Sequence, residues 1–332
     1  MNALRTGYTT GVCMTAAALA AYREYLGERV SEVTVALPNG ELTLPVVRLA
    51  ACRYSVTKDA GDDPDVTHGC EVIVSLTPGG EPAAADYLVG NIILRGGAGV
   101  GLVSRGGLAA ECGKAAINPA PRRMLAKNLP EVADRVTLTI EVPNGEDIAQ
   151  KTLNPALGVI GGISILGTSG IVHPFSHKAY TAAIALQLRQ NPGNCVLTTG
   201  TRTAAAAQRD YPGTAVIIIG DFIGDALKLA RNHNVTVACM PGKLLKYACG
   251  ELNTHAASAK QSLSNLSRLG IGVPGGVPAG VSTMRGLGEH LGSEEFKRLL
   301  EHLASRAGEE LTVIHGKALA LAVYDDQGER LL

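Results

Sequence analysis

Residues 195–238 read CVLTTGTRTAAAAQRDYPGTAVIIIGDFIGDALKLARNHNVTVA, and this stretch decides the fold class. Strand patterns alternate with helical patterns in it and just beyond it, in the order 195–197, 203–209, 215–219, 222–232, 235–238 and 243–252. Strands that are apolar throughout and separated by helices are typical of a parallel sheet covered on both faces. A further helix is predicted from Ser176 to Gln190. We therefore predict a three-layer, Rossmann-like α/β domain over residues 176–332.

The end of the chain continues less regularly. We predict a helix over 256–268, a Gly/Pro-rich linker over 270–280 and a helix over 293–306. Two closing strands are expected around Thr312 and Leu321.

The first half of the chain has a different pattern of predicted strands and helices. A helix is predicted from Thr10 to Leu26, where Gly27 can end it. Apolar runs flank Pro38-Asn39-Gly40, and Asn-Gly between such runs is a strong hairpin signal. The run at 136–142 precedes Asn144-Gly145, which predicts a second hairpin. Short strands and a helix that begins at Pro121 complete an α+β domain over residues 1–175, with the strands near 53–58, 70–76 and 90–95.

The overall composition excludes several classes of protein. The chain has 332 residues, with 30 Lys plus Arg and 30 Asp plus Glu, so it carries no formal net charge at pH 7. Proteins that neutralise nucleic-acid phosphates carry a basic excess, so we expect no nucleic-acid partner. No apolar run reaches the roughly 18 residues that span a bilayer, so we expect no membrane partner. The 40 glycines fall in clusters, which indicates loops that approach something closely.

The cysteines and the N-terminal segment indicate the compartment. Seven cysteines are spread along the chain without a Cys-x-x-Cys pair, which argues against a disulfide framework or a structural zinc site. Residues 12–20 resemble a signal peptide, because Ala18-Leu19-Ala20 imitates a cleavage site. Thr9-Thr10-Gly11 precedes this run and an ordinary helical pattern continues it. We therefore expect a cytoplasmic protein.

The segment 58–69, KDAGDDPDVTHG, concentrates four carboxylates and one histidine. Packing like charges costs free energy, so the array suggests a cation site, a general base or capping of backbone amides. The spacing does not fit a calcium-binding EF-hand loop. A solvated acidic turn stabilised by Asx hydrogen bonds explains the same residues.

Cations recur at predicted helix starts, where the helix dipole disfavours them. Arg122 and Arg123 follow Pro121, and Lys243 follows Pro241-Gly242. A bound anion would reverse the sign of the interaction, which points to a polyanionic ligand. Arginines that curl back to solvent or to a carboxylate explain the pattern equally well.

Glycine-rich segments occur at 95–107 and 154–172. The second is almost uncharged and suits backbone that approaches a flat apolar ligand, or a tight crossing between domains. Gly220-Asp221 follows the most apolar strand, at the edge where open parallel sheets bind ligands. Asp221 suits a ribose hydroxyl or a helix cap. Gly242-Lys243 is not a P-loop, because the upstream glycine and the following Ser or Thr are absent.

Taken together, these segments resemble the CbiD family, the cobalt-precorrin-5B (C-1)-methyltransferases of anaerobic cobalamin biosynthesis. The resemblance is carried, in order, by LRTGYTTG at 4–11, the acidic segment 58–69, GVG at 99–101, AINP at 116–119 with Pro121-Arg122, GGISILGTSGIV at 161–172, and GKL at 242–244 with Thr254-His255. It extends over residues 4–262, most of the chain.

The resemblance implies methyl transfer from S-adenosylmethionine to ring carbon 1 of a cobalt-bound tetrapyrrole, which converts cobalt-precorrin-5B into cobalt-precorrin-6A. Residues 1–175 are expected to bind the substrate and residues 176–332 the cofactor. Cations expected to hold the substrate's acetates and propionates are Arg5, Lys58, Arg95, Arg105, Arg122 and Arg123. The expected catalytic residues are Asp62, Asp63 and His68. Residues expected to bind S-adenosylmethionine are Thr199, Gly200, Asp221, Gly242, Lys243 and His255.

Cobalt arrives within the substrate, so no protein metal site is required. Other cobalamin-pathway enzymes and further copies of the chain are partners that the sequence leaves open. The alternative function is a non-catalytic tetrapyrrole-binding or carrier protein that has kept these loops. From the residues without the resemblance, a phosphate- or nucleotide-handling α/β enzyme ranks first.

Overall fold

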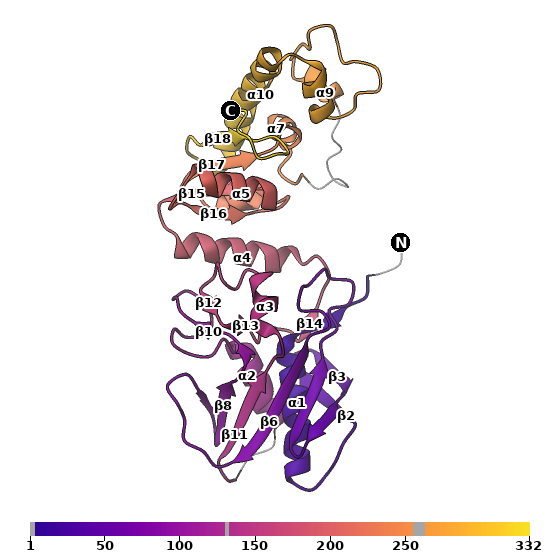
Figure 1. Cartoon of the computed structure of the whole chain (residues 1–332), viewed down its shortest axis with the longest axis vertical. Coiled ribbons are helices and arrows are strands. Elements are labelled where there is room, and N and C mark those ends of the chain that lie inside the picture. The colour runs from indigo at the N-terminus through magenta and orange to yellow at the C-terminus, as the bar shows by residue number, and fades with distance from the viewer. Residues whose placement is uncertain (1–3, 130–132, 255–262) are drawn as a thin grey trace. The chain divides into compact units, whose positions relative to one another are not determined.

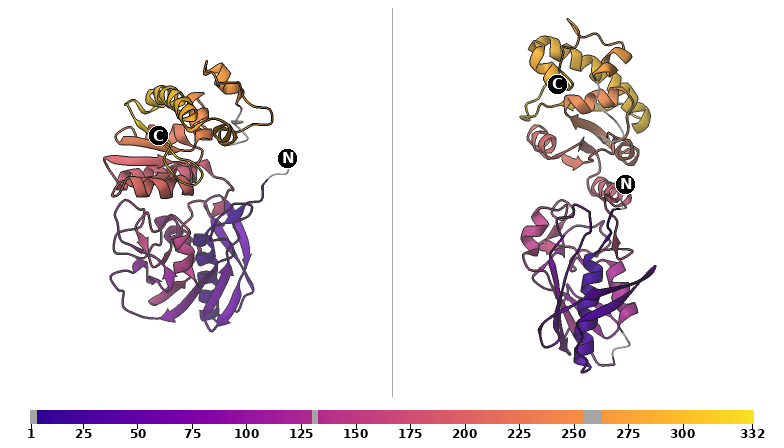
Figure 2. Two further views of the ribbon diagram at one scale, coloured as in Figure 1. Left: turned by 45° about the horizontal axis from the view of Figure 1, so that its top comes forward. Right: turned by 90° about the vertical axis from the view of Figure 1, so that its right-hand side faces the viewer.

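The computed structural model describes residues 4–129, 133–254 and 263–332. The chain divides into two compact units, Met1–Ser176 and His177–Leu332. Figure 1 labels many of their helices and strands, and Figure 2 gives two further views. Each unit has its own large hydrophobic core, so each is described by itself.

A six-stranded mixed sheet forms the centre of the first unit. In spatial order its strands are β4 (Val47–Ala50), β5 (Arg53–Thr57), β6 (Glu71–Pro78), β11 (Val136–Glu141), β8 (Ile92–Gly96) and β7 (Tyr87–Val89). The three strands predicted near 53–58, 70–76 and 90–95 are therefore confirmed. The predicted N-terminal helix is α1 (Thr10–Tyr25), which packs against β5 and β6. All its residues from Thr10 to Tyr22 are buried, and its small alanine side chains permit this close approach.

Short ladders join distant parts of the first unit. They pair β1 (Gly7–Tyr8) with β14 (Ile171–Val172), β9 (Gly99–Val100) with β13 (Gly162–Ile163), and β10 (Leu102–Val103) with β12 (Val159–Ile160). The start of the chain therefore lies beside the glycine-rich segment 159–172. The hairpin predicted at Pro38-Asn39-Gly40 is confirmed as β2 (Glu32–Leu37) and β3 (Gly40–Pro45). The helix predicted from Pro121 is α2 (Pro119–Asn128), which packs against α1.

The second predicted hairpin is wrong. Asn144 is left-handed, with φ 57°, but Gly145 begins the helix α3 (Gly145–Gln150), and no strand in the described ranges returns from it along β11. The neighbours of β11 are instead β6, antiparallel, and β8, parallel. A side chain at Gly145 would collide with the carbonyl group of Gly99. The glycine serves this close backbone contact rather than a two-residue turn.

The second unit is built on a four-stranded parallel sheet. Its strands, in the order β16–β15–β17–β18, are Ala215–Ile218, Asn194–Thr198, Asn234–Cys239 and Ala320–Val323. Alternate residues of β15 belong to different cores. Cys195 and Leu197 belong to the core that contains residues of four helices, α4 (His177–Gln190), α6 (Ile223–Leu229), α7 (Pro241–Ala248) and α10 (Ser293–His315). Val196 packs with Ala206 and Ala207 of α5 (Thr201–Asp210). The predicted parallel sheet with helices on both faces is present.

The end of the chain departs from the prediction at one element. The strand expected around Thr312 is wrong, because α10 runs on through this position to His315. Its buried residues Leu299, Leu303, Ala307 and Leu311 recur every four residues and form one continuous apolar stripe. The strand expected around Leu321 is confirmed as β18. The helix expected over 256–268 falls partly on residues outside the described ranges. Its described part contains α8 (Ser264–Arg268). A further helix, α9 (Met284–His290), follows the linker.

The cysteines differ sharply in exposure. Cys112 is exposed, whereas Cys13, Cys70, Cys195 and Cys239 are buried. Burial raises the pKa of the Cys70 and Cys195 thiols to about 11 and that of Cys239 to about 12. Across the described part of the chain, no helix combines the length and the apolar character needed to cross a membrane.

Candidate functional site

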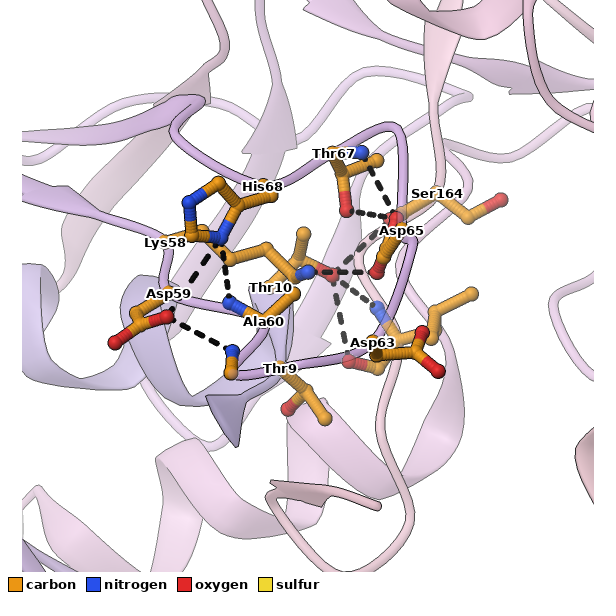
Figure 3. Close-up of polar contacts among 12 residues, drawn as sticks. Thr9, Thr10, Lys58, Asp59, Ala60, Asp63, Asp65, Thr67, His68 and Ser164 are labelled. Carbon is orange, nitrogen blue, oxygen red and sulfur yellow. Dashed lines mark hydrogen bonds and ion pairs between the residues drawn. The ribbon is translucent and has the colours of Figure 1, made fainter. Parts of the chain in front are cut away.

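The acidic segment forms a closed loop between β5 and β6. Its base is fixed by backbone hydrogen bonds from Lys58 N–H to the Cys70 carbonyl group and from Gly69 N–H to the Lys58 carbonyl group, both 2.8 Å. Within it, the Lys58 ammonium donates a 2.7 Å hydrogen bond to Oδ2 of Asp65. Lys58 is only 2% exposed. Figure 3 shows this ion pair with the surrounding residues.

Asp65 is held on both of its oxygens. Oδ1 accepts hydrogen bonds from the Thr67 N–H at 2.8 Å and from the Thr67 hydroxyl at 2.7 Å, while Oδ2 accepts from Lys58. Burial favours the neutral acid, but the hydrogen bond and charge of Lys58, with the Thr67 donors, outweigh it and keep the pKa of Asp65 below its usual value. Asp65 is therefore an ionised partner that fixes the Lys58 ammonium.

A cavity of about 180 Å³ lies at this ion pair. We call it the Lys58 pocket; its lining residues are Thr9, Thr10, Lys58, Asp65, Thr67, Thr152, Asn154, Ile163, Ser164, Leu166 and Val172. The lining combines the acidic loop, the start of α1 and the glycine-rich segment. The Thr10 hydroxyl group joins the last two, because it donates to the Ser164 carbonyl group at 3.2 Å and accepts from the Leu166 N–H at 2.9 Å. Eight of the eleven lining residues carry polar side chains.

The three residues predicted to be catalytic lie on the same loop but outside the lining of the pocket. Asp62 accepts the N–H of Arg5 at 2.7 Å, and Asp63 accepts the N–H of Phe175 at 2.8 Å. His68 is exposed, and its Nδ1 accepts the Ala60 N–H at 3.0 Å, so a neutral ring carries its proton on Nε2. The loop brings these groups near one another, and their chemical roles remain predictions.

Two of the predicted substrate-binding arginines are paired with carboxylates. Arg5 forms an ion pair with Asp59, and this hydrogen bond holds the pKa of Asp59 below its usual value. Arg95 donates from Nε and Nη2 to Asp86 at 2.7–3.2 Å. The Asp86 side chain is only 3% exposed, so Arg95 satisfies a buried carboxylate at the edge of the sheet.

The other three predicted substrate-binding arginines differ in exposure, and the Arg122 side chain is only 20% exposed. Arg105 lies with its side-chain stem beside Gly158. The guanidinium of Arg122 stacks 3.8 Å above the ring of Tyr87, and its Nη2 lies 3.8 Å from Glu111. Arg123, the next residue of α2, is exposed. None of the five predicted arginines lines the Lys58 pocket.

In the second unit, the predicted cofactor residues Asp221 and Lys243 meet. The Lys243 ammonium pairs with Oδ1 of Asp221 and donates to the Thr254 hydroxyl group at 2.7 Å. Thr254 donates in turn to Asp221 at 2.8 Å, and its carbonyl group accepts from Lys246 at 2.8 Å. Two lysines of α7 and one carboxylate therefore converge on the buried Thr254.

A cavity of about 730 Å³ opens beside these lysines. We call it the α7 cavity, because Gly242, Lys243 and Lys246 of α7 line it. Its other charged lining residues are Arg285, Glu289, Glu294, Lys297, Asp325, Asp326 and Arg330, and its apolar ones are Met240, Pro241, Phe296, Leu300 and Leu331. Met240 follows β17 and Asp325 follows β18 by two residues, so the cavity lies at the carboxyl edge of the parallel sheet.

The remaining predicted cofactor residues are placed differently. Thr199 and Gly200 follow β15 at the same edge of the sheet, where Gly200 is the N-cap of α5; neither lines the α7 cavity. His255 lies outside the described residues. Over the ranges that the structure describes, no group of three or more His, Cys, Asp or Glu side chains is arranged to hold a metal ion.

Several features of these sites were absent from the prediction. Asp65, Thr67, Lys246 and Thr254 were not singled out as site residues, although Asp65 was counted in the acidic loop. A signal for Asp65 was present, because Asp65-Val-Thr67 has the spacing of an Asx turn, in which a carboxylate accepts the N–H two residues on. Both cavities depend on contacts between distant segments, which a local pattern does not reveal.

Comparison with known proteins gives a consistent result. The CbiD family model matches residues 1–174. The cobalt-precorrin-5B C(1)-methyltransferase of Geotalea daltonii is 42% identical over 291 residues, which cover 79% of each chain, and that of Geobacillus kaustophilus is 37% identical over 360 residues, covering 99% of this chain and 94% of the relative. A solved structure, a cobalamin biosynthesis protein (cbiD) from Archaeoglobus fulgidus, is 27% identical, with a TM-score of 0.43 and coverage of 81% of this chain and 85% of that one. On the extent of the family match and the identity to these relatives, this chain belongs to the CbiD family.

Proposed function

We propose that this protein transfers a methyl group from S-adenosylmethionine to carbon 1 of cobalt-precorrin-5B, giving cobalt-precorrin-6A. The observation that carries the proposal is the similarity to relatives named cobalt-precorrin-5B C(1)-methyltransferase, which extends over 99% of this chain in one case. Cobalt belongs to the substrate in this reaction.

The α7 cavity is our proposed site for the methyl donor, within a Rossmann-like unit over residues 177–332. Its volume of about 730 Å³ lies in the range of small-molecule sites, about 300–1,000 Å³. S-adenosylmethionine carries a carboxylate, an ammonium, a ribose diol and an adenine ring. The cavity offers cations, carboxylates and the Phe296 ring, so its chemistry fits each part. Open α/β sheets bind ligands at the carboxyl ends of their strands, which also supports this position.

In this proposal the positive charge of Lys243 attracts the donor's carboxylate, while the three N–H donors of Lys243 go to Asp221 and to the hydroxyl and carbonyl oxygens of Thr254. Asp221 and Thr254 hold the ammonium group of Lys243 in place, so little side-chain entropy of Lys243 is lost when the ligand binds. Gly242 lines the cavity and is proposed to contact the donor with its backbone, whereas Thr199 and Gly200 lie at the same edge of the sheet but outside the lining.

The first unit is proposed to bind the tetrapyrrole. Exposed cations suit the acetate and propionate arms, and Arg105 and Arg123 are exposed. The glycine-rich ladders present backbone to a flat ring. The sulfonium methyl group is already activated, so the protein's main tasks are in-line positioning and exclusion of water. Asp62, Asp63 and His68 are our proposed groups for proton handling.

The test is single-turnover methyl transfer with S-adenosylmethionine that carries a deuterated methyl group. Mass spectrometry should detect one labelled methyl group on the tetrapyrrole, and NMR should place it on carbon 1. Calorimetry should detect S-adenosylhomocysteine binding to the wild type. Lys243→Met should weaken that binding about ten-fold, since the attraction between the Lys243 charge and the donor's carboxylate is lost. Lys228→Met, at an exposed position of α6, is the matched control.

The contrary result is equally clear. A protein that binds the tetrapyrrole but neither binds S-adenosylhomocysteine nor transfers the label is a carrier. Unchanged donor binding in Lys243→Met, with catalysis intact in the wild type, would move the donor site away from the α7 cavity.

A further inference from the structure

The Lys58 ammonium is buried with most of its hydrogen-bonding capacity unused. An ammonium group has three N–H donors. Within the described residues, one acceptor is recorded for Lys58, namely Oδ2 of Asp65. The residue is 2% exposed and lines the Lys58 pocket. Buried polar donors are normally satisfied, so a cation in this state calls for a further acceptor.

Asp65 does not supply that acceptor. Its second oxygen is engaged by both donors of Thr67, and these contacts fix the carboxylate on one side of the ammonium. Asp65 therefore orients Lys58 while leaving its remaining donors available. The other side of the pocket carries neutral hydroxyl and amide groups, from Thr10, Asn154 and Ser164.

The helix α1 adds to the preference for an anion. Thr9, its N-cap, and Thr10 both line the pocket, and the first turn of this 16-residue helix contains no acidic residue. No acidic side chain of the helix therefore offsets the positive end of its dipole, although the N–H groups of Val12 and Gly11 are already bonded to Thr9 and to the Leu166 carbonyl group. Lys58 and the helix end together outweigh the one carboxylate, Asp65, in the lining.

The size and rim of the pocket restrict the ligand. A volume of about 180 Å³ holds a short acid chain and excludes a macrocycle. Leu166, which is 46% exposed, lines the pocket, and Val66, 45% exposed, lies between the lining residues Asp65 and Thr67. A ligand with an apolar body and a short acidic arm matches this arrangement.

We propose that the Lys58 pocket is a carboxylate subsite that receives one acidic arm of the substrate, with Lys58 as the binding residue and Asp65 as its positioning residue. This inference rests on the proposed function for the identity of the ring, but the subsite is defined by its own residues. Lys58 lies between two carboxylates, that of Asp65 and that of the ligand, and the pocket fixes the orientation of the ring.

The test uses the full chain with two corrinoid probes, cobyrinic acid and its heptamethyl ester. Cobyrinic acid should bind to the wild type more tightly than to Lys58→Met by about ten- to a hundred-fold, the effect of losing a charge-assisted hydrogen bond. The ester should bind to both proteins equally, because it lacks the charge that Lys58 recognises. Lys151→Met, at an exposed lysine at the end of α3, is the matched control and should bind cobyrinic acid as the wild type does.

A second variant protects the test against misfolding. Lys58→Met with Asp65→Asn removes both charges, so no unpaired charge remains buried; it should fold and show the same loss of cobyrinic acid affinity. Asp65→Asn alone should weaken the binding of cobyrinic acid less than Lys58→Met does, because it keeps the Lys58 charge that recognises the acid.

The outcomes separate the subsite from the proposed function. S-adenosylhomocysteine binding retained in every variant, with cobyrinic acid binding lost in those lacking Lys58, supports the subsite. Equal cobyrinic acid affinity in the wild type and the folded double variant overturns it, whatever the donor does. A wild type that binds cobyrinic acid through Lys58 but neither binds the donor nor methylates its substrate keeps the subsite and overturns the methyltransferase proposal.

Discussion

Replacement of Asp65 by asparagine should destabilise the first unit more than replacement of its partner Lys58 by methionine. Breaking a buried ion pair by removing one partner costs about 3–5 kcal/mol of unfolding free energy. The Asp65 side chain is 27% exposed, and an asparagine can still accept from Thr67, so we expect about 2–3 kcal/mol for Asp65→Asn. Lys58, at 2% exposure, has little contact with water when it loses this partner. In Lys58→Met, Asp65 keeps its hydrogen bonds to Thr67 and its contact with water, so we expect this variant to lose about 1–2 kcal/mol of unfolding free energy.

The double variant provides the decisive comparison. Lys58→Met with Asp65→Asn removes both charges and should lie closer to the wild type than Asp65→Asn does. Urea unfolding should be combined with hydrogen exchange over residues 54–76, because a chain of two units need not unfold in one step. Asp62→Asn, at an exposed position of the same loop, is the control. An Asp65→Asn variant as stable as this control, or a double variant less stable than either single one, would show that the ion pair does not stabilise the first unit.

The same pair predicts a pH dependence. Burial opposes ionisation, but Lys58 and Thr67 keep the pKa of Asp65 below its usual value. A carboxyl group with a lowered folded pKa stabilises the fold above its unfolded pKa of about 3.9, and this contribution is lost as the pH falls through the folded value. The stability difference between the wild type and Asp65→Asn should therefore be full near neutral pH and should narrow below about pH 4. A difference that widens on acidification contradicts the assignment.

Three further substitutions test the packing by urea unfolding. Asp86→Ala should destabilise the first unit by about 1–3 kcal/mol, because the Arg95 donors lose their buried acceptor; an unchanged midpoint would show that water replaces it. Gly99→Ala should cost several times more than Gly27→Ala, since both have positive φ, at 74° and 95°, but only the side chain added at Gly99 meets backbone within 4 Å; equal costs would refute the close contact. Leu303→Ala, at a position of α10 with 0% exposure, should destabilise the second unit by about 2–5 kcal/mol, and a loss below about 1 kcal/mol would indicate a loosely packed helix interface.

The second unit was largely predictable because its sequence signals are local. The strands β15, β16 and β17 are mostly apolar and are separated by helix-length segments, so the parallel sheet follows from order and pattern. The strand expected around Thr312 failed because that expectation ignored the four-residue spacing of Leu303, Ala307 and Leu311, which extends the helix past this position.

The first unit was less predictable because its glycines act in tertiary contacts. Asn144-Gly145 has the composition of a hairpin turn, but Gly145 is selected by the approach of Gly99 from a segment far away in sequence. The acidic loop was recognised as a candidate site from its composition. Which carboxylate faces Lys58 was not, because that depends on how the loop folds over the start of α1 and the segment 163–166.

The uneven burial of the thiols has a practical consequence for spectroscopy. Only a thiolate reacts readily with a maleimide, and burial keeps Cys70, Cys195 and Cys239 protonated at neutral pH. Cys112 alone among the seven cysteines is exposed, so a fluorophore should attach there preferentially without prior removal of the others. A label on Cys112 would be attached to the residue next to Glu111, whose carboxylate lies 3.8 Å from Arg122. It would report on the electrostatic surroundings of that arginine in otherwise unmodified protein.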